Sequence, residues 1–493
     1  MDRALTRPHL TRLASMVVLT CGVTLACTAS EPPTGSTGSA GGPGPGSTGA
    51  GGSGVDTTGG GGSGTVTGTG GSTGAGGAAP TGAGGAGGKV TTGAGGAGGG
   101  VTPTGAGGSS VPPPPPLDCG PIGTVLNNAG PPKNRVNYVI LADGYTSTTV
   151  NTTLMTHMTN AMTERFTAEL GQPYLRYKNF VNICLFKTVS QTDGIGNGAT
   201  IFSCTGNDTS RLANCNTQVA QTQLTMNTPA GMNVTWHSIV LNGTSWWNTG
   251  SVWMLWSGGN TNGPKAALHE GGHGFHQLAD EYCARGTGSG CGTTNGGTAV
   301  GQEFQEVNST GNPTTTDKWP MWLGTTQKGM AVPDMGATGV QGIFVGSRYV
   351  DTGQYRPTIN SKMNSLFGNA KDTSYNSVSR EKMVMDIWRV VVPVDSTVPA
   401  AGAVSNPSTL TVNVIDPAVI NVDWSVDGTV VAANGGTTFN VAGRGLSAGS
   451  HTIAAKAYDN ATTDLVLQRT GANWGRMNWA RSQQTVTWTV TVP

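Results

Sequence analysis

The chain has 493 residues, a formal net charge of +1 and only 11% charged residues. It contains 79 glycines, many of them crowded into the first quarter, so a sizeable part of the length cannot contribute to a packed core. No basic run occurs beyond the extreme N-terminus, which argues against nucleic acid as a partner.

The N-terminus has the pattern of an export signal over residues 1–27. Arginines near the start form a basic region, and the apolar segment 13–25 that follows is too short for a stable membrane span. The signal ends in Leu-Ala-Cys27, which resembles a bacterial lipobox, a motif whose Cys is acylated. The alternative is simple cleavage near Ala29, which would release the chain. We therefore expect an outer-membrane or cell-surface lipoprotein, or a secreted protein, that meets the membrane only through this anchor.

Residues 28–117 are expected to be a disordered tether. They repeat Gly, Ala, Thr and Ser, and end in a run of prolines at 112–116. Such a tract lacks the apolar side chains that would offset its ordering entropy, while the prolines form a stiff extended stub. The tether would hold the folded body away from a membrane or wall.

Residues 118–395 have the pattern of an α+β domain with a mixed sheet. Apolar residues recur every four positions between Leu154 and Phe166, which predicts an amphipathic helix, and the stripe from Val384 to Val391 predicts a closing helix. The region between them, 283–360, is expected to be irregular. Buried strands are expected at 136–142, 180–186, 237–241 and 251–256.

Residues 396–493 are expected to form an Ig-like β-sandwich behind a linker at 393–399. Short alternating segments are separated by turn signals such as Asp427-Gly428. The expected strands are 410–414, 420–424, 437–441, 451–457 and 485–492.

The cysteine pattern suits disulfides in an exported chain. Two of the eight Cys lie in the leader, and the other six are Cys119, Cys184, Cys204, Cys215, Cys283 and Cys291. The short spacings favour Cys204–Cys215 and Cys283–Cys291, which leaves Cys119–Cys184. A Cys-rich zinc site is the alternative, but no C-x-x-C spacing supports it.

The motif that points to a catalytic metal site is H-E-x-x-H, formed by His269, Glu270 and His273. Residues four apart share one face of a helix, so both imidazoles can bind one zinc ion while an open position remains for water. Glu270 is placed to take the proton of that water. Three glycines within 271–274 are poor helix formers, which indicates that the backbone must approach something closely.

A catalytic zinc needs a third protein ligand, and Asp280 is the first choice. On an unbroken helix it would lie about 16 Å along the axis from His269. The chain must therefore turn sharply between His276 and Ala279 to bring Asp280 back. His276, Glu281 and a more distant Glu remain alternatives.

The run HEGGHGFHQLADEY resembles the zinc signature of the IgA peptidase-type metallopeptidases, which are metzincin-like. The segment 134–145 resembles the opening strand of that family, and Tyr355-Arg356-Pro357 with Met363 resembles its late segment, where a Met-turn lies beneath the zinc. The resemblance implies a metzincin-like domain over about 130–392, with zinc held by His269, His273 and Asp280 and with Glu270 as the base.

Two tyrosines and one strand are further candidates at such a site. Tyr282 and Tyr355 could stabilise an oxyanion, with a packed aromatic as the alternative for each. No Tyr stands two residues after Met363, as one does in some metzincins. The strand 251–256 would be an edge strand that pairs with an extended peptide, with an interior strand as the alternative.

We therefore expect a monomeric, exported zinc endopeptidase that acts on protein or peptide substrates. The rival interpretation is a surface adhesin or wall-binding protein with a structural metal site, and a zinc amidase acting on cell-wall peptides is a third. Glu270 separates the first two, because a purely structural site does not need a base beside its ligands.

Overall fold

The computed structural model describes residues 116–166, 171–196, 199–283, 301–312, 318–324, 340–364, 374–461 and 479–493. The expected signal at 1–27 and nearly all of the expected tether at 28–117 lie outside these residues. Within the described ranges, no helix combines the length and the apolar character that a membrane crossing requires.

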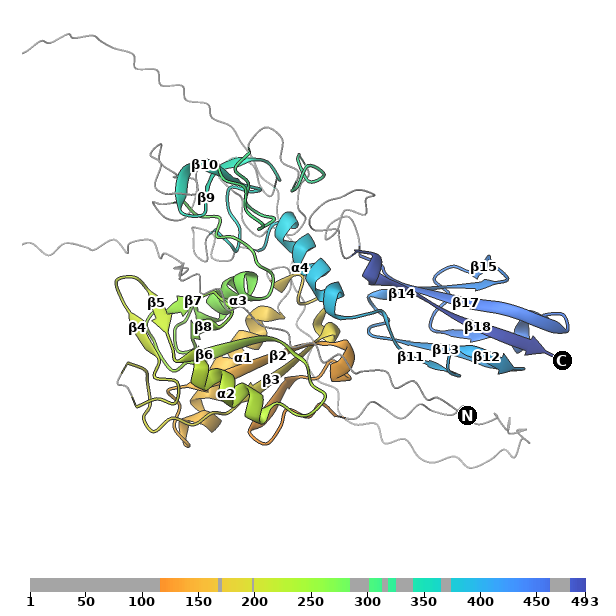
Figure 1. Ribbon diagram of the computed structural model, residues 1–493, viewed down its shortest axis with the longest axis horizontal. Coiled ribbons are helices and arrows are strands. Elements are labelled where there is room, and N and C mark those ends of the chain that lie inside the picture. Colours follow the sequence, from red (N-terminus) through yellow and green to blue (C-terminus); the bar gives the residue numbers. More distant parts are fainter. Residues whose placement is uncertain are drawn as a thin grey trace, which may run out of the picture. The chain divides into compact units, whose positions relative to one another are not determined.

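The N-terminal half is built on one mixed sheet with the strand order β1-β3-β2-β6-β8-β7-β5-β4 (Figure 1). The central pairs β2–β3, β2–β6 and β6–β8 are parallel, while β1–β3, β7–β8 and β4–β5 are antiparallel. The expected mixed sheet is thus confirmed. Its strands are β1 (Gly123–Asn127), β2 (Val136–Asp143), β3 (Val181–Phe186), β4 (Thr205–Asn207), β5 (Leu212–Asn214), β6 (Val234–Leu241), β7 (Asn248–Thr249) and β8 (Met254–Ser257).

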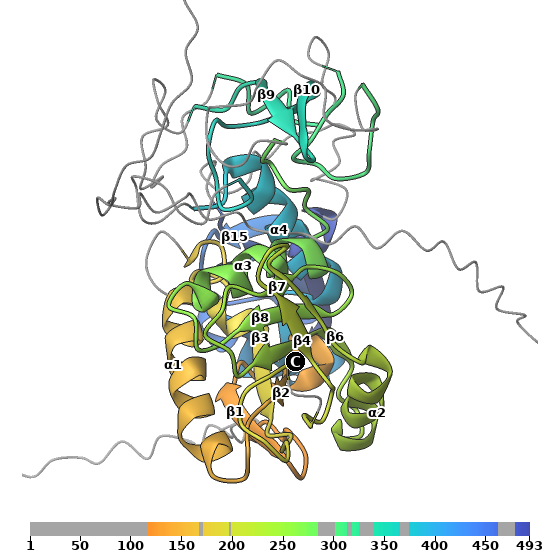
Figure 2. The ribbon, with the colours of Figure 1, turned by 90° about the vertical axis from the view of Figure 1, so that its left-hand side faces the viewer.

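Helices cover both faces of this sheet. They are α1 (Thr153–Arg165), α2 (Thr217–Asn227) and α3 (Gly263–Gly274), and Figure 2 shows α1 and α2 on opposite sides of the strands. Successive side chains of β2 alternate between the faces. Tyr138 packs in the same cluster as Leu268 of α3, whereas Val139 packs in the cluster that contains Leu224 of α2. Because β2 is central, both of its faces are buried.

The expectation that the strand at 251–256 is an edge strand is wrong. The strand, β8, begins at Met254 and lies between β6 and β7 in the sheet. The partner β7 is only two residues long and turns directly into β8, with Thr249 opposite Leu255. So short a partner gives no periodic signal of its own, which is why the sequence did not reveal it.

Two elements follow the metal-binding motif before the C-terminal strands begin. A hairpin of β9 (Phe344–Ser347) and β10 (Val350–Arg356) lies in the region expected to be irregular, so that expectation is wrong for these residues. Helix α4 (Ser377–Val390) confirms the expected closing helix. Its buried face contributes Val384, Ile387 and Trp388 to the main apolar cluster.

The C-terminal strands form one sheet of three and one of five that pack face to face. Trp424 of the larger sheet stacks on Phe439 of the smaller, with ring centroids 5.0 Å apart. The expected linker at 393–399 contains a strand, β11, paired with β13. The strands are β11 (Val394–Val398), β12 (Gly402–Ser405), β13 (Thr409–Val414), β14 (Ile420–Val426), β15 (Thr429–Ala432), β16 (Thr438–Asn440), β17 (Gly449–Asp459) and β18 (Gln483–Val492).

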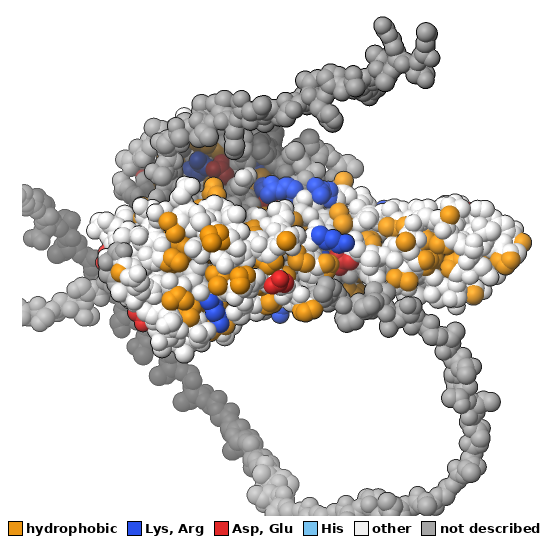
Figure 3. Space-filling view, turned by 60° about the horizontal axis from the view of Figure 1, so that its bottom comes forward, with side chains coloured by type: hydrophobic (Ala, Val, Ile, Leu, Met, Phe, Trp, Pro, Cys, Tyr) orange, Lys and Arg blue, Asp and Glu red, His pale blue; other side chains and the backbone are white. Residues whose placement is uncertain are grey.

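Charged side chains are sparse on the face shown in Figure 3. They are few among the apolar and uncharged side chains, as the low charged fraction of the sequence leads one to expect. One charge that the fold does bury is Arg135, which pairs with the half-buried Asp395 at 2.8 Å.

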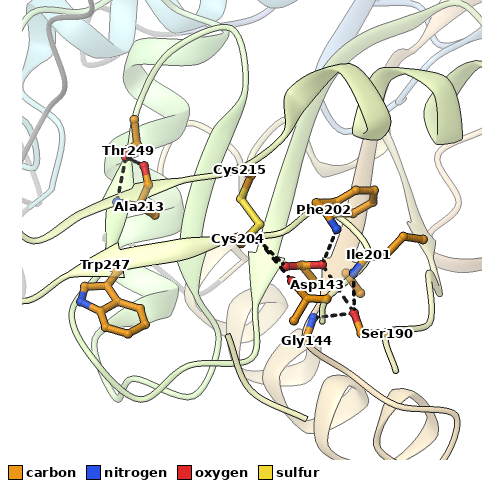
Figure 4. Close-up of a disulfide and its surroundings, with 12 residues drawn as sticks. Asp143, Gly144, Ser190, Ile201, Phe202, Cys204, Ala213, Cys215, Trp247 and Thr249 are labelled. Atoms are coloured by element: carbon orange, nitrogen blue, oxygen red, sulfur yellow. Dashed lines mark hydrogen bonds between the residues drawn. A yellow bond between two sulfur atoms is a disulfide. The ribbon is translucent and has the colours of Figure 1, made fainter. Parts of the chain in front are cut away.

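Two disulfides tie loops to the sheet. Cys119–Cys184 links the segment before β1 to β3, and Cys204–Cys215 closes a loop beyond β3, so both expected pairings are confirmed. Figure 4 shows the second bridge beside Asp143, whose carboxylate accepts the N–H groups of nearby loop residues. The expected partner of Cys283, Cys291, lies outside the described residues.

Replacing both Cys119 and Cys184 by Ala should lower the free energy of unfolding by about 4 kcal/mol, because the bridge closes a loop with a sequence separation of 65. Removing Cys204–Cys215, with a separation of 11, should cost about 3 kcal/mol. Denaturant unfolding without reductant measures both values. A larger loss for the shorter loop would contradict the chain-entropy argument.

Candidate metal centre and active site

Helix α3 carries glycines where side chains would not fit. A Cβ at Gly271 would lie 2.8 Å from the ring of Trp236, and one at Gly272 would lie 2.5 Å from Sδ of Met363. The third glycine would place its Cβ 2.8 Å from Met254. The close backbone approach expected from the sequence is therefore present, against two strands of the sheet and against the segment around Met363.

Both imidazoles of the motif point to one place. Nδ1 of His269 lies 2.8 Å from the carbonyl oxygen of Lys362, and Nδ1 of His273 lies 2.7 Å from that of Leu278. A carbonyl only accepts, so each Nδ1 must carry the proton, and in a neutral ring Nε2 then presents its lone pair. The two Nε2 atoms are 3.2 Å apart.

The chain turns back after α3, as the position of Asp280 requires. Gln277 adopts a left-handed conformation with φ of 52°, and the N–H of Leu278 returns to the carbonyl of Gly272 at 2.9 Å. Oδ1 of Asp280 consequently lies 3.1 Å from Nε2 of His269 and 3.2 Å from that of His273. The structure thus brings the three expected ligands together.

The donor set fits a metal ion. Three acceptor atoms, two lone pairs and one carboxylate oxygen, meet in a buried space, and Oδ1 of Asp280 has no hydrogen-bond partner within the described part of the chain. Lone pairs and a carboxylate charge that converge in this way repel one another unless a cation lies between them. Tetrahedral zinc with bonds of about 2.0–2.1 Å sets its ligand atoms roughly 3.3 Å apart, which is close to the observed spacing.

Glu270 lies beside this cluster as a buried, unpartnered carboxylate. It is fully buried, and neither carboxylate oxygen has a hydrogen-bond partner among the described residues. The pKa of Glu270 is raised to about 7, chiefly by burial and to a lesser degree by the carboxylate of Asp280, although positive charge at the two imidazoles acts in the opposite direction. A carboxylate with a pKa near neutrality can both accept and return a proton.

The neighbouring Asp280 has the opposite tendency. Burial opposes its ionisation, but positive charge at His273 and His269 outweighs burial and holds the pKa of Asp280 well below its usual value. The pocket is therefore one in which this carboxylate stays ionised, as a metal ligand must.

The alternative third ligands point elsewhere. The carboxylate of Glu281 accepts hydrogen bonds from the side chains of Ser361, Asn308 and Asn376 at 2.7–2.8 Å. His276 uses both ring nitrogens away from the cluster, with Nε2 2.9 Å from the hydroxyl of Tyr174 and Nδ1 3.1 Å from Asp386. Neither side chain joins His269, His273 and Asp280.

The segment 361–363 packs against α3 and supports the site. Met363 is fully buried against Gly272, and its carbonyl accepts the N–H of Glu281 at 2.7 Å. Lys362 supplies the carbonyl that orients His269. The segment therefore holds both His269 and the chain beside Asp280 in place, which agrees with the supporting role beneath the metal that the resemblance implied for Met363.

Sequence reasoning missed Tyr349, at the tip of the β9–β10 hairpin. Its hydroxyl donates to Oδ2 of Asp280 and lies 3.4 Å from the hydroxyl of Tyr282, one of the two tyrosines considered from sequence. Tyr282 packs its ring edge-on against Tyr349, and Tyr355 belongs to β10, where its backbone pairs with Thr310. Only the folding of a distant hairpin onto Asp280 reveals this residue, and no local pattern points to it.

A cavity of about 520 Å³ opens beside the cluster. His273 and Asp280 lie in its wall, together with Gly250, whose absent side chain leaves room for the base, since a Cβ there would lie 2.4 Å from Oε2 of Glu270. The opposite wall carries an ion pair between Arg348 and Glu306. The candidate ligands are therefore reachable by a molecule in the cavity.

The model of a family described as IgA Peptidase M64 matches residues 124–335. Members of this family are metallopeptidases. The matched range contains α3 and Asp280, and it ends before the β9–β10 hairpin and Met363. No curated protein matches the chain.

Replacing Asp280 by Ala should weaken divalent metal binding by more than the roughly 10–100-fold expected for loss of an outer partner of a ligand. The reason is that Asp280 supplies one of the three converging atoms. Equilibrium competition with a chromophoric chelator measures the dissociation constant. The control is Glu306→Ala, which removes a carboxylate from the same cavity but not from the cluster; equal affinities of the two variants would contradict the ligand assignment.

Proposed function

Because residues 124–335 match the model of the IgA Peptidase M64 family, we propose that the protein is an exported zinc-dependent endopeptidase. The observation that carries this proposal is the unpartnered, buried carboxylate of Glu270 beside two imidazoles and the carboxylate of Asp280. Two imidazoles and one carboxylate with an open fourth position are typical of catalytic zinc. The family name describes the family, and we do not take immunoglobulin as the substrate of this chain.

The residues of the site have distinct roles in this proposal. A zinc ion held by His269, His273 and Asp280 would acidify a bound water and polarise the scissile carbonyl. Glu270 accepts a proton from the attacking water at its carboxylate and delivers that proton to the nitrogen of the leaving amine. The carbonyls of Lys362 and Leu278 keep the proton of each imidazole on Nδ1 and so hold the rings in place.

An open cavity supports a catalytic site over a structural one. Structural zinc sites are closed by four protein ligands, whereas catalytic sites leave one position open. Here the cluster offers three ligand residues and borders a cavity of about 520 Å³. A binding protein with a purely structural ion would need neither that cavity nor Glu270.

Glu270→Gln should lower peptide hydrolysis by about 100–10,000-fold, the usual contribution of a general base, while zinc binding is retained. The glutamine has nearly the same shape but cannot accept the proton. The measurement is digestion of a proteome-derived peptide library by the secreted or lipidated full chain, with zinc content determined in parallel. The absence of hydrolysis by both wild type and variant, across the library, would favour a binding protein.

We further propose that the chain is exported and anchored by a lipid on Cys27. The lipobox-like sequence supports this, as do the two disulfides, which form and persist in oxidising compartments.

Cys27→Ser should abolish incorporation of a labelled fatty acid and shift the protein from the membrane fraction to the soluble fraction. The reason is that acylation requires the thiol. Labelling of cells that express wild type or variant measures this, with Cys21→Ser as the matched control in the leader. Labelling of the Cys27→Ser chain at the wild-type level would contradict the anchor.

A further inference from the structure

The β9–β10 hairpin has an unusual tip. Arg348 and Tyr349 connect the two strands, and both have positive φ, 52° and 66°. Two-residue hairpin turns of this kind favour Asn and Gly, because the left-handed region costs other residues about 1–2 kcal/mol each. Such backbone persists only where surrounding contacts hold it, and it concentrates at functional sites.

Three hydrogen bonds tie this tip to the segment that carries Asp280, beside the ion pair of Arg348 with Glu306. The N–H of Arg348 donates to the carbonyl of Asp280 at 3.0 Å, and the N–H of Tyr349 donates to that of Tyr282 at 3.1 Å. The hydroxyl of Ser347 donates to the same Asp280 carbonyl at 3.1 Å. The hairpin is therefore docked along 280–282, and its docking aims the Tyr349 side chain at the Asp280 carboxylate.

The two oxygens of Asp280 are divided between different partners. Oδ1 faces both imidazoles, while Oδ2 accepts a hydrogen bond from the Tyr349 hydroxyl. We propose that Tyr349 is a positioning residue that engages Oδ2, so that Asp280 presents only Oδ1 to the metal. This inference rests on the proposed function, because it takes His269, His273 and Asp280 to be the zinc ligands.

The division matters because zinc in a catalytic site needs an open position. A carboxylate that can rotate offers both of its oxygens to the ion, which fills the position that water requires. The Tyr349 hydroxyl opposes that rotation and also satisfies an oxygen that is otherwise buried without a partner. Partners of this kind typically contribute about 10–100-fold to metal affinity.

The hydroxyl can be separated from the packing of the ring. The Tyr349 ring lies edge-on to Tyr282, with centroids 5.1 Å apart, and a Phe would keep that contact. Tyr355 lies on the same hairpin, in β10, and its hydroxyl does not contact Asp280 within the described residues, so Tyr355→Phe is a matched control.

Tyr349→Phe should raise the zinc dissociation constant about 10–100-fold, measured by chelator competition on the full chain, while Tyr355→Phe stays within about twofold of wild type. Loading with cobalt(II) gives a second readout. If the freed carboxylate binds through both oxygens, the visible absorption of the cobalt should weaken, because higher coordination numbers absorb less strongly. A purely structural role would leave that spectrum unchanged.

A double-variant cycle separates this inference from the proposed function. Once Asp280→Ala has removed the carboxylate, adding Tyr349→Phe should cause no further loss of zinc affinity. Wild-type affinity and spectrum in Tyr349→Phe would overturn the inference alone, as would an equal loss on both backgrounds. Failure of wild type to bind zinc, or wild-type affinity in Asp280→Ala, would overturn the proposed function and the inference with it.

Discussion

The convergence of two imidazole nitrogens and one carboxylate oxygen on a single buried point is the constraint on which the rest of this structure depends. The Nε2 atoms of His269 and His273 and Oδ1 of Asp280 lie 3.1–3.2 Å from one another in a buried space. Without a cation this arrangement is unfavourable, because each atom loses hydration and gains repulsion. The surrounding contacts hold it nonetheless, which is the mark of a site organised before its ion arrives.

Those contacts hold strained backbone in the segments around Asp280. Gln277, Arg348 and Tyr349 all have positive φ, and all three lie either in the turn that leads to Asp280 or in the hairpin docked against it. Each such residue costs on the order of 1–2 kcal/mol. Strain at all three positions, on two segments separated by some seventy residues of chain, means that the position of this one carboxylate is specified from both sides.

Local sequence patterns predicted the part of the site that one helix carries. His269 and His273 share a face because they are four residues apart, and the need for a turn near Gln277 followed from helix length alone. The sheet and α4 were likewise predictable, because their apolar periodicity is strong. Tyr349 was not, because its contact with Asp280 spans 69 residues and lies in a segment without periodicity.

The errors have equally local causes. The strand β8 was expected to be an edge because the resemblance places an edge strand before the metal-site helix, and its two-residue partner β7 is too short to show alternation in the sequence. The strand β11 was taken for a linker because prolines flank it at Pro393 and Pro399. Proline does interrupt sheets, but it is tolerated directly before and after a strand, where no ladder hydrogen bond is lost.

Helix α4 explains why the C-terminal strands belong to the support of the site. The carboxylate of Asp386 on α4 forms a hydrogen bond with His276, which lies just after α3. Two residues further along α4, the indole N–H of Trp388 donates to Asp459 of β17 at 2.9 Å. Asp459 also accepts a hydrogen bond from Tyr177, which precedes β3. Truncation before β11 would leave these buried donors without their shared acceptor, at a cost of about 1–3 kcal/mol each. The C-terminal sheets therefore support α4, and α4 in turn supports the turn that leads to Asp280.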